Sequence, residues 1–165
     1  MDEKLKTKLS KLKLLALDVD GVLTDGKLFY SENGQELKAF DVKDGLGLKQ
    51  LINAGIDIAI ITSRNSIAVD KRAEEIGIRQ VRQGVKNKLD ALNKICHELK
   101  IEINECAYMG DDLPDFEVMT SAGISLTVAD AATEIIDLAD WVSSRPGGQG
   151  AVREICEIIL RSLET

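Results

Sequence analysis

The sequence predicts an α/β fold in which helices cover both faces of a parallel β-sheet. Short apolar runs of the kind that form buried strands alternate along the chain with amphipathic segments long enough to be helices. This alternation is the order of repeated βαβ units. The length of 165 residues and the hydrophobic share of 44% fit one domain with a substantial core.

The first third of the chain predicts a strand, a hairpin and a helix. Leu12 to Val19 is an apolar run that ends in acidic residues, as a buried strand can. Lys27 to Val42 holds two β-like stretches around Asn33-Gly34, a pair that strongly favours a hairpin turn. Leu46 to Asn53 has the apolar spacing of a helix.

The rest of the chain continues the alternation. Further strands are predicted at Ile56–Thr62, Ile78–Arg82, Cys106–Met109, Gly123–Val128 and Trp141–Ser143. Helices are predicted at Ile67–Ile76, Lys88–Leu99, Asp115–Ser121, Ala132–Leu138 and Ala151–Leu163. We therefore expect a Rossmann-like parallel sheet with a β-hairpin flap after the first strand, in a single domain over residues 1–165.

Charge and cysteine usage exclude several classes of protein. The net charge of −7 works against binding of DNA or RNA, and no apolar run approaches the length of a membrane span. Met1 to Lys13 is rich in lysine and lacks the apolar core of a signal peptide. An odd number of cysteines, three, indicates reduced thiols. These features predict a cytoplasmic protein with no membrane or nucleic-acid partner.

Acidic residues gather where predicted strands end. Asp18 and Asp20 follow the first strand, and Asp111, Asp112 and Asp115 follow the fourth strand. In an open parallel sheet, ligands bind outside the carboxyl ends of the strands. We therefore expect both acidic groups to lie on one rim of the sheet.

The same rim is predicted to carry a hydroxyl and a lysine. Thr62 ends the second strand, and Lys88 opens the helix after the third strand. Carboxylates from two strands suit Mg²⁺, and the cation would offset their mutual repulsion and the charge of a phosphate. One carboxylate can attack phosphorus, while a second protonates the leaving oxygen and later deprotonates water. The set predicts phosphoryl transfer, although either acidic group alone could be a turn or a helix cap.

Four motifs resemble those of the haloacid dehalogenase superfamily. The first is Asp18-Val19-Asp20-Gly21-Val22-Leu23-Thr24-Asp25-Gly26, the second holds Thr62, the third Lys88, and the fourth is Gly110-Asp111-Asp112-Leu113-Pro114-Asp115. The resemblance covers residues 12 to about 150 and leaves no long insertion for a cap domain. The chain is therefore similar to the capless branch of the superfamily.

Within the superfamily, the chain is most similar to the 3-deoxy-D-manno-octulosonate 8-phosphate phosphatases. This closer resemblance rests on the extended first motif, Phe40 to Lys49, Gln83-Gly84, and Arg145 to Glu154. It implies a Mg²⁺-dependent phosphatase that acts on this sugar-acid phosphate through an aspartyl-phosphate, in lipopolysaccharide precursor synthesis. It also implies a homotetramer in which the hairpin of one subunit closes the site of another.

The resemblance implies a role for each motif residue. Asp18 would be the nucleophile and a metal ligand, and Asp111 a further ligand. Asp20 would be the general acid and base, and its backbone carbonyl would also bind the metal. Asp112 and Asp115 would orient the ligands and the lysine. Thr62 and Lys88 would hold phosphoryl oxygens. Positions that contact the sugar phosphate in that family correspond to Asp20, Asp41, Val42, Lys43, Asp44, Gly45, Lys49, Arg64, Arg72 and Lys88.

Two details depart from the family pattern or leave a choice within it. The second motif is usually Thr-Gly-Arg, whereas this chain has Thr62-Ser63-Arg64. Because serine is small, we expect the threonine and the arginine to keep their places. Lys86 is a rival to Lys88 for the phosphate, but Lys88 opens the helix and has the family's spacing from Gln83-Gly84.

Other functions stay open on the sequence. A neighbouring phosphatase specificity would act on a nine-carbon sialic-type acid 9-phosphate. A phosphoacceptor signalling domain also combines acids, a hydroxyl and a lysine, but it needs a long-lived aspartyl-phosphate, which an acid at Asp20 would shorten. A degenerate domain that regulates a nucleotidylyltransferase would not need every catalytic position, and all of them are present.

Overall fold

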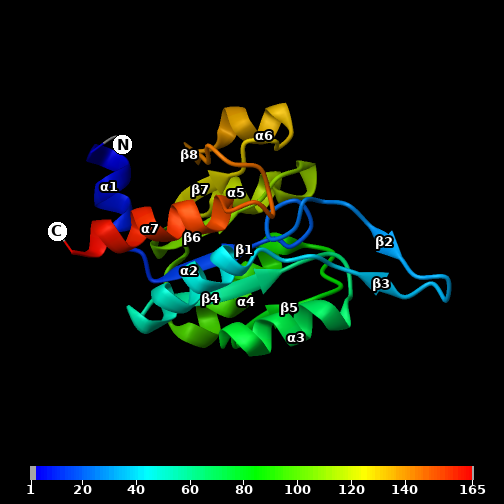
Figure 1. The fold of residues 1–165 in the computed structure, drawn as a ribbon. Coiled ribbons are helices and arrows are strands. Elements are labelled where there is room, and N and C mark those ends of the chain that lie inside the picture. Colours follow the sequence, from blue (N-terminus) through cyan, green and yellow to red (C-terminus); the bar gives the residue numbers. More distant parts are fainter. Residues whose placement is uncertain (1–2, 165) are drawn as a thin grey trace.

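The computed structural model describes residues 3–164 and confirms the α/β fold (Figure 1). Within this range, six strands form one parallel sheet in the order β5-β4-β1-β6-β7-β8. Their bounds are β1 (Leu14–Leu17), β4 (Asp57–Ile61), β5 (Gln80–Arg82), β6 (Cys106–Met109), β7 (Ile124–Thr127) and β8 (Trp141–Val142). Each predicted strand is therefore present, and most are shorter than predicted.

Helices pack on both faces of the sheet. One face is covered by α1 (Glu3–Leu9), α2 (Val42–Asn53), α3 (Ile67–Ile76) and α7 (Ala151–Leu163). The other face is covered by α4 (Lys88–Leu99), α5 (Phe116–Ser121) and α6 (Thr133–Leu138). Successive side chains of a strand point to opposite faces, so Leu15 and Leu17 pack on the first face and Leu14 and Ala16 on the second. Because helices cover both faces, all four residues of β1 are buried, which explains why this strand is apolar throughout.

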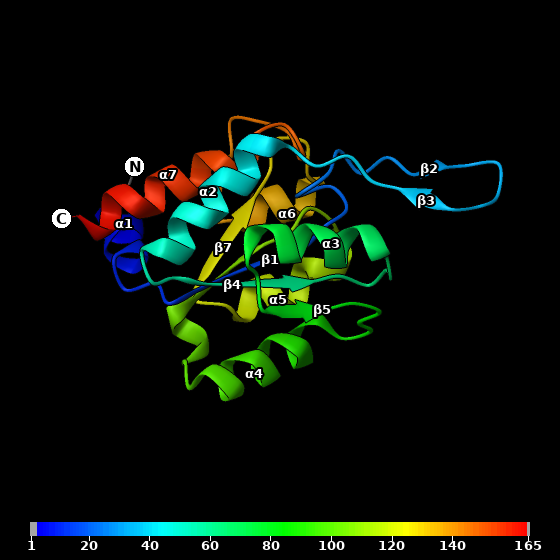
Figure 2. The same cartoon turned by 60° about the horizontal axis from the view of Figure 1, so that its bottom comes forward.

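The hairpin predicted around Asn33-Gly34 is confirmed. β2 (Phe29–Tyr30) pairs antiparallel with β3 (Glu36–Leu37), and Gly34 takes the left-handed conformation that the turn requires. Figures 1 and 2 show this hairpin projecting away from the body of the molecule, beyond the ends of the sheet strands. It therefore lies outside the packed core.

The strand order places a crevice between β1 and β6. From β1 the chain adds β4 and β5 on one side of the sheet, and then β6, β7 and β8 on the other side. The order reverses between β1 and β6, as in a Rossmann-like sheet, and ligands bind at such a reversal outside the carboxyl ends of the strands. Asp18 directly follows β1 and Asp111 lies two residues after β6.

Two helices differ from the prediction by more than one residue. α1 was not predicted, because its segment is mainly charged, yet Leu5 and Leu9 are buried. α2 begins at Val42 rather than Leu46, where Asp41 caps the helix by accepting a hydrogen bond from the backbone of Lys43. Two 3₁₀ turns, η1 (Ile103–Glu105) and η2 (Leu113–Asp115), complete the described elements. None of the helices in residues 3–164 has the length and apolar character to cross a membrane.

Candidate active site

Three carboxylates converge at the crevice between β1 and β6. One oxygen each from Asp18, Asp111 and Asp115 lies within 4.8 Å of the other two. A cavity of about 280 Å³ opens here, lined by Asp18, Asp20, Gly26, Thr62, Ser63, Arg64, Lys88, Asp111, Asp112, Pro114 and Asp115. The crevice thus brings together residues from all four predicted motifs.

Asp115 is fully buried and its oxygens are occupied by donors from the protein. Oδ1 accepts hydrogen bonds from Lys88 at 2.6 Å and from the hydroxyl of Tyr108 at 3.0 Å. Oδ2 accepts from the backbone N–H groups of Asp111 at 3.1 Å and Asp112 at 3.4 Å. This carboxylate therefore fixes the lysine and the loop after β6, which leaves Asp18 and Asp111 as the carboxylates better placed to bind a ligand.

Lys88 joins the two acidic groups. It is the first residue of α4, whose N-cap Asn87 accepts a hydrogen bond from the backbone of Asp90 at 2.8 Å. Its buried Nζ lies 2.7 Å from Oδ2 of Asp18 and 2.6 Å from Oδ1 of Asp115. Burial opposes its charge, but the two carboxylates outweigh burial and raise the pKa of Lys88. Lys86, the rival lysine, is exposed and lines a different cavity.

The acidic cluster fits a hard divalent cation. Burial, and next the Asp115 carboxylate, raise the pKa of Asp18 to about 6. Burial and then Asp18, Asp115 and Asp112 raise the pKa of Asp111 to about 8. Gly21 adds the space that this cluster needs, because a Cβ there would lie 1.9 Å from Oδ2 of Asp111. The raised pKa values show that the carboxylates of Asp18 and Asp111 repel further negative charge, which a cation would offset. Together they form an oxygen donor set that suits Mg²⁺.

Asp20 contacts the base of the hairpin. The contact is made by Lys38, which also pairs with Glu36, and neither hairpin residue was predicted from the sequence to belong to the site. Nζ of Lys38 donates to Oδ1 of Asp20 at 2.5 Å and lies 2.9 Å from Oε1 of Glu36. Burial opposes the charge of Lys38, but its contacts with the carboxylates of Asp20 and Glu36 outweigh burial and raise its pKa. Arg64 contacts Glu36 and also donates to the hydroxyl of Tyr30 at 3.2 Å. The alternation Glu36-Leu37-Lys38 was the available signal, because it puts both charged side chains on one face of the strand.

The second motif lies at the end of β4. Thr62 is buried, and its Oγ1 accepts a weak hydrogen bond of 3.4 Å from the backbone of Arg64. Ser63, where the family usually has glycine, lines the cavity beside Thr62 and Arg64. The serine therefore leaves both neighbours at the cavity.

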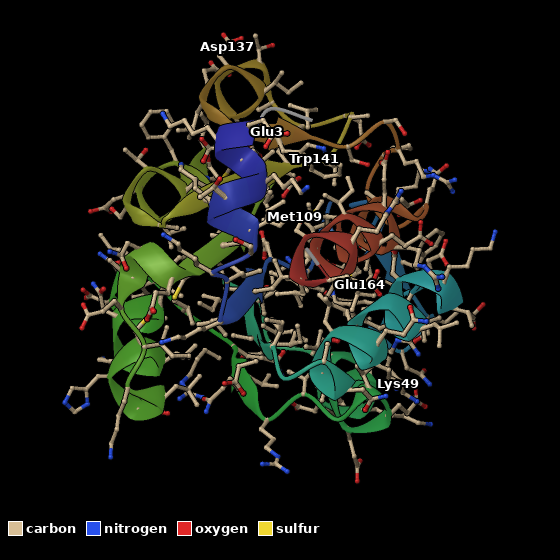
Figure 3. The ribbon with its side chains drawn as sticks, turned by 90° about the vertical axis from the view of Figure 1, so that its left-hand side faces the viewer. Glu3, Lys49, Met109, Asp137, Trp141 and Glu164 are labelled. Atoms are coloured by element: carbon tan, nitrogen blue, oxygen red, sulfur yellow. The ribbon has the colours of Figure 1, made fainter. Side chains whose placement is uncertain are left out.

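The remaining predicted contacts lie outside this cavity. Arg72 donates to the carbonyl of Asp41 at 3.1 Å and packs closely on Gly45, where a Cβ would clash with its guanidinium. Lys43 lines a separate cavity of about 560 Å³ with Arg145, Arg153 and Arg161, among others. Lys49 is an exposed residue of α2, labelled in the view from the end opposite the hairpin (Figure 3). Val42 is exposed, whereas Asp44 is buried beside the start of α7.

Known proteins are similar to this chain in both sequence and fold. A family described as haloacid dehalogenase-like hydrolase matches residues 80–155. A 3-deoxy-D-manno-octulosonate 8-phosphate phosphatase from Salmonella typhi is 46% identical over 154 residues, which is 93% of this chain and 82% of that protein. The phosphatase of the same description from Yersinia pestis is 43% identical over 151 residues, with 92% and 81% covered.

Solved structures give the same result. The phosphatase of this description from Moraxella catarrhalis, in complex with a magnesium ion, a phosphate ion and a KDO molecule, has a TM-score of 0.97 and 44% identity. The match covers 99% of this chain and 94% of that one. A cobalt-bound phosphatase from Haemophilus influenzae has a TM-score of 0.92 at 38% identity, with 95% and 92% covered.

Proposed function

This chain belongs to the 3-deoxy-D-manno-octulosonate 8-phosphate phosphatase family of haloacid dehalogenase-like hydrolases, and on that premise we propose that it hydrolyses this phosphate ester to the free sugar acid and phosphate. The observation that carries the proposal is the buried Lys88 between Asp18 and Asp115, with Asp111 alongside. Such a cluster can hold a cation and a phosphoryl group at one nucleophile.

The reaction consists of two displacements at phosphorus, in which the residues of the cavity have different roles. An oxygen of Asp18 forms a bond to phosphorus as the bond to the sugar oxygen breaks, and Asp20 gives that oxygen a proton. Water then attacks the aspartyl-phosphate, and Asp20 takes the proton as phosphate leaves. Lys88 and the hydroxyl of Thr62 stabilise the phosphoryl oxygens. Asp18, Asp111 and the backbone carbonyl of Asp20 would hold Mg²⁺, which supplies Lewis-acid stabilisation of the phosphoryl charge.

Phosphate release from the sugar-acid phosphate tests this function directly. We expect turnover with Mg²⁺, loss of turnover in excess chelator, and recovery when Mg²⁺ is restored. Asp18→Asn should lower kcat by several orders of magnitude because it removes the nucleophile. Asp137→Asn, an equivalent change at an exposed acid of α6, should keep full activity. Full turnover by the Asp18 variant would refute the nucleophile assignment.

The length of the sugar acid is a separate question. The relatives are named for the eight-carbon substrate, so we expect a higher kcat/KM for the eight-carbon 8-phosphate than for a nine-carbon acid 9-phosphate. Steady-state kinetics on both compounds with one enzyme preparation measure this ratio. A ratio that favours the nine-carbon compound would change the substrate but keep the reaction.

The active form is proposed to be a homotetramer whose sites are closed by a neighbour's hairpin. Four large apolar residues of the hairpin region are exposed in the single chain: Leu28, Phe29, Tyr30 and Leu37. Within residues 3–164 the hairpin is the segment that projects from the α/β body (Figure 1), which supports a capless single domain.

A cytoplasmic location is proposed as well. The buried free cysteines Cys96, Cys106 and Cys156 agree with a reducing, cytoplasmic location.

A further inference from the structure

Lys38 is an unusually buried charge at the base of the hairpin. Only 2% of its side chain is exposed, although it follows β3 of a hairpin that is otherwise open to solvent. Removing an ammonium group from water is costly unless carboxylates and hydrogen bonds compensate it. Asp20 and Glu36 provide this compensation at 2.5 Å and 2.9 Å. The hairpin is thereby fastened to the cavity through Asp20.

Each carboxylate oxygen of Asp20 has a different environment. Oδ1 accepts the short hydrogen bond from Lys38. Oδ2 lies 3.9 Å from Nε of Arg64, and Asp20 itself lines the catalytic cavity. Lys38 can therefore fix the rotation of the carboxyl group through one oxygen while the other stays available to the cavity.

We propose that Lys38, held by Glu36, is a positioning residue that aims the carboxyl group of Asp20 at the leaving oxygen. The inference rests on the proposed function, in which Asp20 donates the proton. In that step the bond from Asp18 to phosphorus forms, the bond to the leaving oxygen breaks, and the proton of Asp20 moves to that oxygen. Lys38 touches none of the reacting atoms and acts through the orientation of Asp20 alone.

Leaving-group dependence separates this role from a purely structural one. Phenyl phosphate and para-nitrophenyl phosphate have nearly the same shape, but the phenyl ester has the more basic leaving oxygen and needs the proton more. The parameter kcat/KM reports the steps up to departure of that oxygen, so it isolates the first displacement. A loss of positioning must therefore reduce kcat/KM for the phenyl ester more than for the nitrophenyl ester.

We expect Lys38→Met to lower kcat/KM for phenyl phosphate by roughly 100-fold, the low end of the general-acid contribution, and to affect the nitrophenyl ester far less. Lys38→Arg keeps the cation and should restore most of the activity on the phenyl ester. Glu36→Gln should give a smaller effect of the same kind. Lys27→Met, the same change at a hairpin lysine that is 73% exposed, should match the unchanged enzyme on both esters.

Asp20→Asn separates the general-acid role of Asp20 from the positioning role of Lys38. If Asp20→Asn loses activity selectively on the phenyl ester and Lys38→Met does not, the positioning role is refuted while the proposed mechanism stands. If Asp20→Asn reduces both esters equally, the general-acid assignment fails, and the role of Lys38 fails with it. Equal losses on both esters for Lys38→Met, with a normal circular dichroism spectrum, would indicate only a structural role.

Discussion

At the scale of single residues, Asp115 determines which carboxylates of the cluster stay available. It accepts hydrogen bonds from Lys88, Tyr108 and two backbone N–H groups, so its oxygens are already satisfied. Asp111 instead has a raised pKa because burial and neighbouring acids oppose its charge. A divalent cation would remove that opposition. Asp115 therefore stabilises the structure of the site, whereas Asp111 stays available to bind a ligand.

Gly21 gives the first prediction at this scale. Its φ is +91°, and a Cβ would lie 1.9 Å from Oδ2 of Asp111. Gly21→Ala should therefore displace the Asp111 carboxylate and strain the loop. We expect the Mg²⁺ concentration for half-maximal activity to rise by about tenfold or more, which corresponds to roughly 1.4 kcal/mol of lost binding. A Mg²⁺ titration of phosphate release measures this change.

Gly34→Ala is the matched control for backbone strain. Gly34 also has a positive φ, of +77°, but no atom lies within 4 Å of the position of a Cβ. Both substitutions force alanine into a left-handed conformation, yet only the change at Gly21 meets a carboxylate. If both variants shift the Mg²⁺ titration equally, strain rather than contact with Asp111 explains the effect.

At the scale of elements, the local sequence pattern predicts helix bounds that neighbouring residues determine. It misses the bounds that depend on packing against another element. The helices Ile67–Ile76, Lys88–Leu99 and Ala151–Leu163 were predicted with the bounds that the structure has, because each carries its own apolar stripe and end signals. The start of α2 was missed because Gly45 and Gly47 argue against a helix. Gly47 packs against α7, where a Cβ would lie 3.0 Å from Cys156.

The site shows the same division between local and long-range information. Strand ends and spacing were enough to expect Asp18, Asp111 and Lys88 on one rim, where the structure brings them together. The contact between Lys38 and Asp20 joins the hairpin to the loop after β1, and no local pattern specifies that approach. The sequence predicts the hairpin but not the approach of its base to Asp20.

The junction of α2 and α7 gives a prediction on pH. Asp44 is 1% exposed and accepts a hydrogen bond of 2.8 Å from the backbone of Arg153 in the first turn of α7. Burial raises the pKa of Asp44 to about 6 from an ordinary value of 3.8. Between these values the folded chain holds a proton that the unfolded chain has released, so the contribution of Asp44 to stability falls as pH rises. Above about pH 6 the full penalty applies.

Asp44→Asn removes this titration and keeps an oxygen for the hydrogen bond. From pH 5 to pH 8 the original chain should therefore lose about 1 kcal/mol of unfolding free energy relative to the variant. Urea unfolding of both proteins at pH 5 and pH 8 gives the change in unfolding free energy of each. Any effect of the asparagine that does not depend on pH cancels when the two changes are compared. Parallel changes in the two proteins would show that Asp44 does not titrate in this range.

At the scale of the whole molecule, the net charge of −7 conceals opposite local fields. Five acids of the two motifs, Asp18, Asp20, Asp111, Asp112 and Asp115, line one cavity. Lys88 and Arg64 line the same cavity, and Lys38 is bonded to one of its acids. An anionic sugar phosphate meets these cations and a bound Mg²⁺ rather than the average charge. The negative total still disfavours nucleic acid.

Assembly is the last property to test, and the exposed hairpin makes the prediction specific. Phe29 and Leu37 are cross-strand partners, each about half exposed, and an apolar pair of this kind on a projecting hairpin favours burial against another copy. Phe29→Asp places a charge in that contact and should convert the proposed tetramer of 18.0-kDa chains into smaller species in light scattering.

The same variant tests whether the neighbour completes the site. If one subunit's hairpin closes another subunit's cavity, Phe29→Asp should lower kcat/KM for the sugar phosphate, and activity per chain should fall further on dilution as assembly is lost. Val142→Asp, at an exposed apolar residue of β8 away from the hairpin, should leave both assembly and activity unchanged. A dissociated Phe29 variant with full activity would mean that each chain closes its own site, with Lys38 and Glu36 as the hairpin's contacts to Asp20 and Arg64 of that cavity.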